Sequence, residues 1–179
     1  MSLIGTLVLH SFPKVSGSPP EIIEELTDFQ DRGAWSVGYM PNELVGAEAL
    51  PLLSQLCEWT GQPSLTAFIF EGDCAFVSAL TPDGSFFSSC LARAAAAGLD
   101  DLDSAQATER YGSPEQASAR AAAWAVAAGL RPDVPHLTAV FSETGEDDSE
   151  IWFGYALFNR LLAALGVPAS TNRTFYDDE

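Results

Sequence analysis

"LTAFIFEGDCAFVSALTPDGSFFSSCL", residues 65–91, is the stretch that decides the fold. Three short apolar runs, LTAFIF, CAFVSAL and SFFSSCL, are separated by EGD and by TPDG. Runs of this length between Asp, Gly and Pro residues are typical of strands joined by tight turns. The stretch therefore predicts a three-stranded antiparallel meander.

Two strands and two helices are expected before the meander. LIGTLVLHSF (3–12) is apolar on both alternating faces, as in a strand covered on both sides, and AWSVGYM (34–40) alternates large with small side chains. Residues 18–33 begin with a capping-box spacing and end at a glycine, which predicts a helix, and residues 46–61 have helical periodicity. The apolar stripe of the first helix consists of Ile22, Ile23, Leu26 and Phe29.

The chain after the meander has the patterns of helices. Residues 113–130 start with Ser113 and Gln116 at capping-box spacing and continue through an alanine-rich body, which predicts a helix. Residues 133–141 keep helical spacing and favour a short helix over a sixth strand. Residues 151–165 are apolar on most sides and predict a helix within the core.

These elements predict an α+β fold. It has a mixed, largely antiparallel sheet of about five strands, in the order β-α-β-α-β-β-β, with the helical C-terminal half packed on one face. We expect a single domain over residues 1–168, which is long enough for a sizeable core, and a flexible tail over residues 169–179.

The charge balance limits the possible partners. The formal net charge is −17, because 25 acidic residues face only 8 basic ones, and Lys14 is the single lysine. Phosphate contacts require Lys and Arg, so we expect no binding to nucleic acid or to an anionic membrane. No apolar run reaches the roughly 20 residues of a membrane span, and the N-terminus has no secretory pattern. We therefore expect a cytoplasmic protein.

The residue spacing predicts neither a metal nor a cofactor. Two histidines and three cysteines (Cys57, Cys74 and Cys90) are dispersed without paired ligand spacing, and buried free thiols are the expected state of the cysteines. The acidic run 143–150 and the cluster at 100–103 do not match the ligand positions of a calcium loop.

Candidates for catalysis are weak. His10 and Cys90 stand near the ends of predicted strands, and they could meet if the first strand lies beside the meander. With Tyr39 they are the polar groups that a pocket between the sheet and the C-terminal helices could use. The sequence has no nucleophile elbow, phosphate loop or zinc-protease motif.

A second interpretation is a non-enzymatic binding protein. The acidic side chains lie opposite the apolar stripe of the first predicted helix or in the run 143–150, where a solvated surface and a helix start also explain them. A basic protein partner would be steered to these charges. In general type, a small acidic domain without catalytic motifs is similar to immunity proteins that neutralise toxins. The partner-binding candidates are Glu21, Glu24, Glu25, Asp28, Asp31, Glu143, Glu146, Asp147, Asp148 and Glu150.

Three functions thus remain open from the sequence. The first is the acidic binding protein of inhibitor type, and the second is a small-molecule enzyme or ligand-binding protein. The third is a structural or self-associating domain, which an exposed face on the final helix would favour. The sequence does not indicate an oligomeric state.

Overall fold

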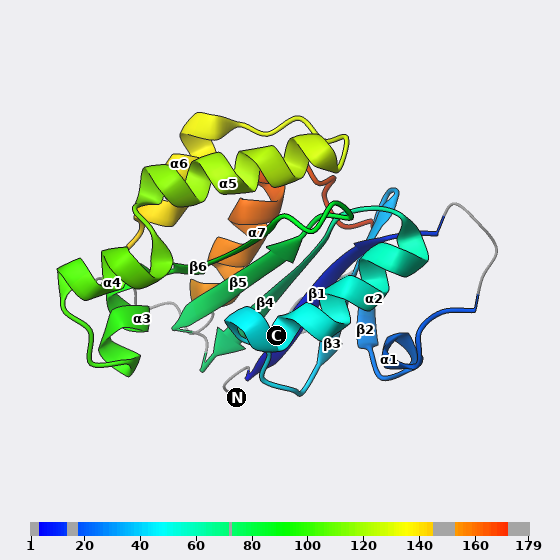
Figure 1. Cartoon of the computed structure of the whole chain (residues 1–179), viewed down its shortest axis with the longest axis horizontal. Coiled ribbons are helices and arrows are strands. Elements are labelled where there is room, and N and C mark those ends of the chain that lie inside the picture. The colour runs from blue at the N-terminus through cyan, green and yellow to red at the C-terminus, as the bar shows by residue number, and fades with distance from the viewer. Residues whose placement is uncertain (1–3, 14–17, 72, 145–152, 172–179) are drawn as a thin grey trace.

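The computed structural model describes residues 4–13, 18–71, 73–144 and 153–171 (Figure 1). One six-stranded sheet forms the centre, in the order β2-β3-β1-β4-β5-β6, and every neighbouring pair is antiparallel. The strands are β1 (Gly5–Ser11), β2 (Thr27–Arg32), β3 (Trp35–Met40), β4 (Ser64–Phe70), β5 (Cys74–Leu80) and β6 (Phe86–Leu91). β1 therefore lies in the interior of the sheet, between two hairpins.

Helices surround both faces of this sheet. In Figure 1, α2 lies in front of it and α7 behind it, whereas α5 and α6 lie together along the top. The helical elements are α1 (Glu21–Glu24), the 3₁₀ helix η1 (Gly46–Ala49), α2 (Leu50–Thr60), α3 (Arg93–Leu99), α4 (Ser104–Tyr111), α5 (Pro114–Ala127), α6 (Val134–Ser142) and α7 (Phe153–Leu165). Within the described residues, no helix is long and apolar enough to cross a membrane.

The alternation of side chains along β1 divides the core in two. Val8 packs with Leu52 and Leu56 of α2, whereas Leu7 and Leu9 belong to the larger cluster that includes α7. Successive side chains of a strand point to opposite faces, so a strand with helices on both sides must be apolar at nearly every position. The sequence of residues 3–12 shows this pattern, and all seven residues of β1 are buried.

Most of the predicted elements are confirmed. The meander forms β4, β5 and β6, and the capping box of Ser113 and Gln116 starts α5. Residues 133–141 are a helix rather than a strand, with Asp133 as its cap. The final helix is in the core, where Leu157, Phe158, Leu161, Leu162 and Leu165 are buried. The α+β fold with a helical C-terminal half is therefore correct.

The helix predicted for residues 18–33 is wrong. Only Glu21–Glu24 are helical, and Thr27–Arg32 form β2, which makes a hairpin with β3. Gln30 and Arg32 are buried on the face that α7 covers, and Gln30 Nε2 donates to the Tyr155 hydroxyl at 2.8 Å. Polar partners from α7 thus stabilise a strand in which the buried positions are not apolar.

The sheet also differs from the prediction in two details. It has six strands instead of about five, because β2 was not foreseen, and it contains no parallel pair among the described strands. An antiparallel arrangement follows from the short hairpins β2-β3, β4-β5 and β5-β6, and from β1 running against both of its neighbours. Two more helices, α3 and α4, follow the meander where no element was predicted.

Candidate functional site

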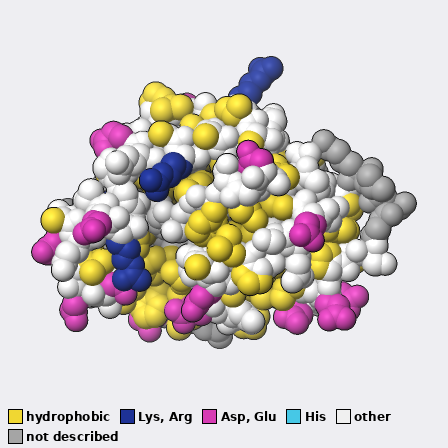
Figure 2. All heavy atoms as spheres, in the orientation of Figure 1, with side chains coloured by type: hydrophobic (Ala, Val, Ile, Leu, Met, Phe, Trp, Pro, Cys, Tyr) yellow, Lys and Arg dark blue, Asp and Glu magenta, His cyan; other side chains and the backbone are white. Residues whose placement is uncertain are grey.

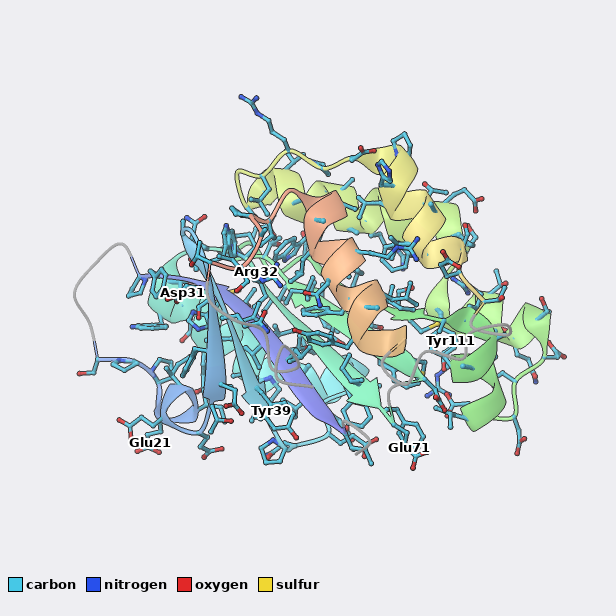
Figure 3. All side chains as sticks on the ribbon, turned by 180° about the vertical axis from the view of Figure 1, so that it is seen from behind. Glu21, Asp31, Arg32, Tyr39, Glu71 and Tyr111 are labelled. Atoms are coloured by element: carbon cyan, nitrogen blue, oxygen red, sulfur yellow. The ribbon has the colours of Figure 1, made fainter. Side chains whose placement is uncertain are left out.

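The alternation of strand direction collects acidic residues at one end of the sheet. β2 starts there, β3 and β4 finish there, and the β4-β5 turn closes there. Figure 3 shows Glu21, Tyr39 and Glu71 along this lower edge, with Asp31 and Arg32 at the opposite end of β2. The exposed carboxylates of this end, named here the acidic end, belong to Glu21, Glu24, Glu25, Asp28, Glu43, Glu48, Glu71 and Asp73. None of them is in an ion pair within the described part of the chain.

A hollow of about 470 Å³ opens at the acidic end, between η1 on one side and α3 and α4 on the other. Phe68 and Phe76 form its floor and are stacked at 6.5 Å between ring centroids, whereas Phe70 is half-buried at the mouth. Leu99 is an exposed apolar side chain on the wall. The lining of this acidic hollow comprises Glu43, Val45, Ala47, Glu48, Phe68, Phe70, Phe76, Leu99, Asp100 and Arg110.

One hydrogen-bonded group fixes the α3–α4 wall of the acidic hollow. Asp100 Oδ2 accepts from the Tyr111 hydroxyl at 2.6 Å and pairs with Arg110 Nη1 at 3.0 Å. The Arg110 guanidinium also lies 5.7 Å from the centre of the Tyr111 ring. Burial of the phenol and its bond to the Asp100 carboxylate raise the pKa of Tyr111, so the hydroxyl stays a donor. The single basic side chain that lines the hollow is thus already neutralised.

Local sequence explains how these walls form. Asp103 and Gln106 make a capping box that starts α4, and Arg110 and Tyr111 are the last two residues of this helix. On the strands, Phe68 and Phe70 are two residues apart, so both rings reach the same face, and Phe76 is paired with Phe68 across the sheet. The floor of the hollow is therefore formed by side chains of two paired strands.

The structure separates the acidic residues that were predicted to share one helix face. Glu21 and Glu24 lie on α1, Glu25 follows it, and Asp28 lies at the start of β2. These four belong to the acidic end. Asp31 is near the other end of β2, where its backbone carbonyl accepts from Thr171. Because the predicted helix does not exist, the candidate surface is an end of the sheet and not a helix face.

The acidic run 143–150 is described only at its first two residues. Glu143 pairs with Arg160 at 2.9 Å, and the backbone carbonyls of Glu143 and Thr144 accept from the first two amides of α3. Glu143 is thus already engaged within the chain. Glu146, Asp147, Asp148 and Glu150 lie outside the described residues, and their role stays a prediction.

His10 is a core residue on the face of the sheet that α2 covers. Its ring is only 3% exposed, lies 5.8 Å from the Trp59 ring, and has Nδ1 at 2.9 Å from the Ser11 carbonyl. In the described part of the chain, its Nε2 has no hydrogen-bond partner. Burial lowers the pKa of His10, so the ring is neutral at pH 7.

His10 and Cys90 do not converge. β1 does lie beside the meander, but β4 and β5 stand between it and β6. Cys90 is aligned through Phe76 and Phe68 with Thr6, four residues before His10. Three strand spacings and four residues along the strand separate the two by roughly 20 Å. The predicted meeting of a base and a nucleophile is therefore wrong.

The cysteines are buried free thiols, as predicted. Burial raises the pKa of Cys90 to about 12 and that of Cys74 to about 12. A thiol with such a pKa carries almost no thiolate at pH 7 and is a poor nucleophile. Tyr39, the third candidate, lies on the opposite sheet face from His10 and donates to the Ile4 carbonyl at 2.8 Å. Its ring packs against Gly5, where a Cβ atom would collide with it.

A second opening lies between the sheet and the C-terminal helices. It measures about 270 Å³ and runs between the β5-β6 turn and α5, with Phe86, Phe87 and Trp124 as its aromatic lining. Figure 2 shows apolar atoms over the middle of this face, between α5 and α2. The lining of this α5 groove comprises Thr81, Asp83, Ser85, Phe86, Phe87, Arg120, Ala123, Trp124 and Ala127. None of His10, Cys90 and Tyr39 is among them.

The two charged groups of the α5 groove differ in availability. Asp83 accepts from the Thr81 hydroxyl and from the Ser85 amide, and these bonds lower the pKa of its carboxyl. Arg120 is exposed and makes no hydrogen bond or ion pair within the described residues. The groove therefore presents one available positive charge.

No family model, curated protein or solved structure matches the chain. In the described residues, no group of three His, Cys, Asp or Glu side chains is placed to hold a metal ion. The functional interpretation consequently depends on the two openings and their charges.

Sequence reasoning missed the residues that build the acidic hollow. Glu43, Glu48, Leu99 and Arg110 come from loops and helices that are brought together only by the sheet order. The capping-box spacing of Asp103 and Gln106 could have predicted the start of α4 from the sequence. Leu99, which precedes α4, is exposed and forms part of the wall of the hollow. No pattern in the sequence indicates that these walls face the phenylalanines of β4 and β5.

Proposed function

We propose that this chain is a non-enzymatic binding protein that docks a basic protein partner at the acidic end. The observation that carries the proposal is the acidic hollow, where an aromatic floor is surrounded by Glu43, Glu48 and Asp100. A cationic side chain of the partner would enter the hollow and contact the half-buried Phe70. The proposal includes the cytoplasmic location expected from the sequence.

Physical chemistry favours this type of ligand. An Arg or Lys side chain carries an apolar stem that packs on aromatic rings and a charged head that the carboxylate rim attracts. The other carboxylates of the acidic end would steer a basic surface to the hollow and speed association, an effect that salt screens over about 10 Å at 0.1 M. Interfaces are often anchored by one such side chain in a central pocket.

An inhibitor or immunity role is the form of this function that we favour. Inhibitors of basic enzymes gain fast association from complementary charge, and they need no catalytic residues of their own. The lack of an activated nucleophile at Cys90 and the neutral, buried state of His10 agree with that role. A toxin or another basic enzyme would be the partner.

The test compares two charge-matched variants with a fluorescent octa-arginine peptide as the probe. Glu43→Gln with Glu48→Gln removes two charges from the hollow, and Glu58→Gln with Glu115→Gln removes two exposed charges elsewhere. We expect the first pair to weaken binding about fivefold to tenfold and the second pair less than about twofold at low salt. Equal weakening by both pairs, or none by either, would reject the hollow as the binding site.

The α5 groove supports a second candidate, a small-molecule binding protein. A single unpaired guanidinium at Arg120 above an aromatic lining fits a carboxylate with an apolar body. The volume of about 270 Å³ is near the lower limit for such sites, so the ligand would be small.

An aromatic carboxylate, phenylacetate, is the probe for this candidate. A thermal-shift titration of the intact chain would show saturable stabilisation that Arg120→Gln removes, while Arg131→Gln, another exposed arginine, retains it. The same stabilisation in the Arg120→Gln variant would remove the groove from consideration.

A further inference from the structure

Arg110 is the basic side chain at the rim of the acidic hollow. It lies on α4, which stands beside α3 at one side of the sheet (Figure 1). Its Nη1 is 3.0 Å from Asp100 Oδ2, and its Cζ lies 5.7 Å from the centre of the Tyr111 ring. The Tyr111 ring is in turn 6.1 Å from that of Phe76, on the floor of the hollow. A guanidinium of the chain itself therefore occupies a carboxylate and an aromatic face at the hollow.

The carboxylate of Asp100 is held in place by a group other than Arg110. The hydroxyl of the buried Tyr111 donates to Asp100 Oδ2 at 2.6 Å. The second oxygen, Oδ1, makes no hydrogen bond or ion pair within the described residues. Asp100 would thus keep its position without Arg110, and it has an oxygen available for a further donor.

Arg110, by contrast, is weakly held. Its side chain is 55% exposed and that of Asp100 is 31% exposed, and one nitrogen–oxygen contact joins them. Such exposed ion pairs contribute little, because water screens the charges and the long side chain loses conformational freedom. Arg110 makes no other hydrogen bond or ion pair in the described part of the chain. Its guanidinium can therefore leave Asp100 at small cost.

We propose that Arg110 is an internal competitor for the cation of the partner, and that the partner displaces it from Asp100 with the guanidinium of an arginine. The proposal rests on the docking function given above. A guanidinium can make two parallel N–H···O bonds to a carboxylate, a geometry that a lysine ammonium does not have. A partner arginine that reached both oxygens would make two bonds where Arg110 makes one. Glu43 and Glu48 would also attract its positive charge.

Competition of this kind makes the hollow selective. In the free chain, Arg110 neutralises Asp100 and repels an approaching cation. A ligand without the two-bond geometry gains too little at Asp100 to remove Arg110, whereas an arginine does gain enough. Arg110 would thus lower the affinity for all cations but lower it least for arginine.

The first test uses the fluorescent octa-arginine peptide. Arg110→Gln frees Asp100, and Arg131→Gln removes the same charge from an exposed arginine outside the hollow. We expect Arg110→Gln to tighten binding about twofold to fivefold, and Arg131→Gln less than about 1.5-fold, at low salt. In an Asp100→Asn chain, whose amide oxygen can still accept from Tyr111, Arg110→Gln should tighten binding no more than Arg131→Gln does.

The second test observes the displacement directly by NMR of the intact chain. Arginine in the chain carries ¹⁵N and the peptide carries none, so only the side chains of the protein are detected. On titration with octa-arginine, the Nε signal of Arg110 should move toward its position in the Asp100→Asn variant, while that of Arg131 stays. Octa-lysine at equal occupancy should move the Arg110 signal much less.

Three results would overturn the proposal. They are an Arg110 signal that does not move at saturation, equal tightening by Arg110→Gln and Arg131→Gln, and equal displacement by octa-lysine. In each case, the docking function survives if Glu43→Gln with Glu48→Gln still weakens binding of octa-arginine. If that pair has no effect, docking at the hollow fails and the competition fails with it.

Discussion

The acidic hollow and the α5 groove have aromatic linings from the same sheet but opposite charge. The hollow has two carboxylates that make no ion pair within the described residues, Glu43 and Glu48, and an Asp100 that is paired with Arg110. The groove has a carboxylate that is already hydrogen-bonded and an arginine that is available. In the functions that we propose, the availability of a charged group, and not its presence, therefore determines which ligand each opening would favour. The contrast also shows why net charge alone could not locate a site.

The largest expected effect tests whether the floor of the hollow is part of the core. Phe68 is 1% exposed, so Phe68→Ala should lower the free energy of unfolding by about 3–5 kcal/mol. Phe70→Ala, at the half-buried mouth, should cost clearly less. Urea unfolding measures both, and equal losses would mean that the mouth of the hollow is as much a part of the core as its floor.

The corresponding residue of the α5 groove is Trp124. Its Nε1 donates to the carbonyls of Ser64 at 3.1 Å and Leu80 at 3.2 Å. Trp124→Phe leaves both buried carbonyls without this donor, so we expect a loss of about 1–3 kcal/mol. Val126→Ala, on the exposed side of α5, is the control and should change stability by less than about 0.5 kcal/mol. A Trp124→Phe variant as stable as the control would show that these bonds contribute little.

A smaller effect is the pH dependence of the free energy of unfolding, which distinguishes the contribution of His10 from that of the acidic end. Because burial lowers the pKa of His10, the unfolded chain takes up a proton near pH 6.5 while the folded chain does not. Stability is therefore complete above about pH 6.5 and falls as the pH drops toward the lowered pKa, by at most about 1.4 kcal/mol per pH unit. Urea midpoints at pH 7 and 5.5 should differ more in the wild-type chain than in His10→Asn. Identical differences would assign the response to other groups.

The smallest effect concerns the aromatic ring at the mouth of the hollow. Phe70→Leu retains an apolar side chain but removes the ring face, so octa-arginine binding should weaken by about 0.5–1 kcal/mol, roughly twofold to fivefold. Phe86→Leu in the α5 groove is the matched control and should leave this binding unchanged. Fluorescence anisotropy measures both, and a stronger effect of Phe86→Leu would move the binding site to the groove.

The same two regions show how far the sequence predicts the structure. Residues 65–91 were predictable because local turn residues and apolar runs determine a meander almost by themselves. Residues 18–33 were not, because Gln30 and Arg32 are buried only through bonds to Tyr155 and Asn159 of α7. A strand whose buried positions are polar has no visible period of two, and the local pattern of Ile22, Ile23 and Leu26 indicated a helix instead.

The site was less predictable than the fold. The acidity of the chain was evident, and four of the predicted partner-binding residues do lie at the acidic end. The hollow itself depends on β1 separating the two halves of the sheet and on α3 and α4 returning to the start of β5, which are long-range arrangements. Residues such as Glu43 and Arg110 acquire a role only after that arrangement is known.

The most direct test of binding at the acidic end is an amide chemical-shift titration of the ¹⁵N-labelled chain with octa-arginine. We expect saturable shifts concentrated at Glu43, Glu48, Phe70 and Asp100, with little change around Arg120. Shifts of similar size over the whole surface, or shifts centred on the α5 groove, would contradict the acidic hollow as the docking site.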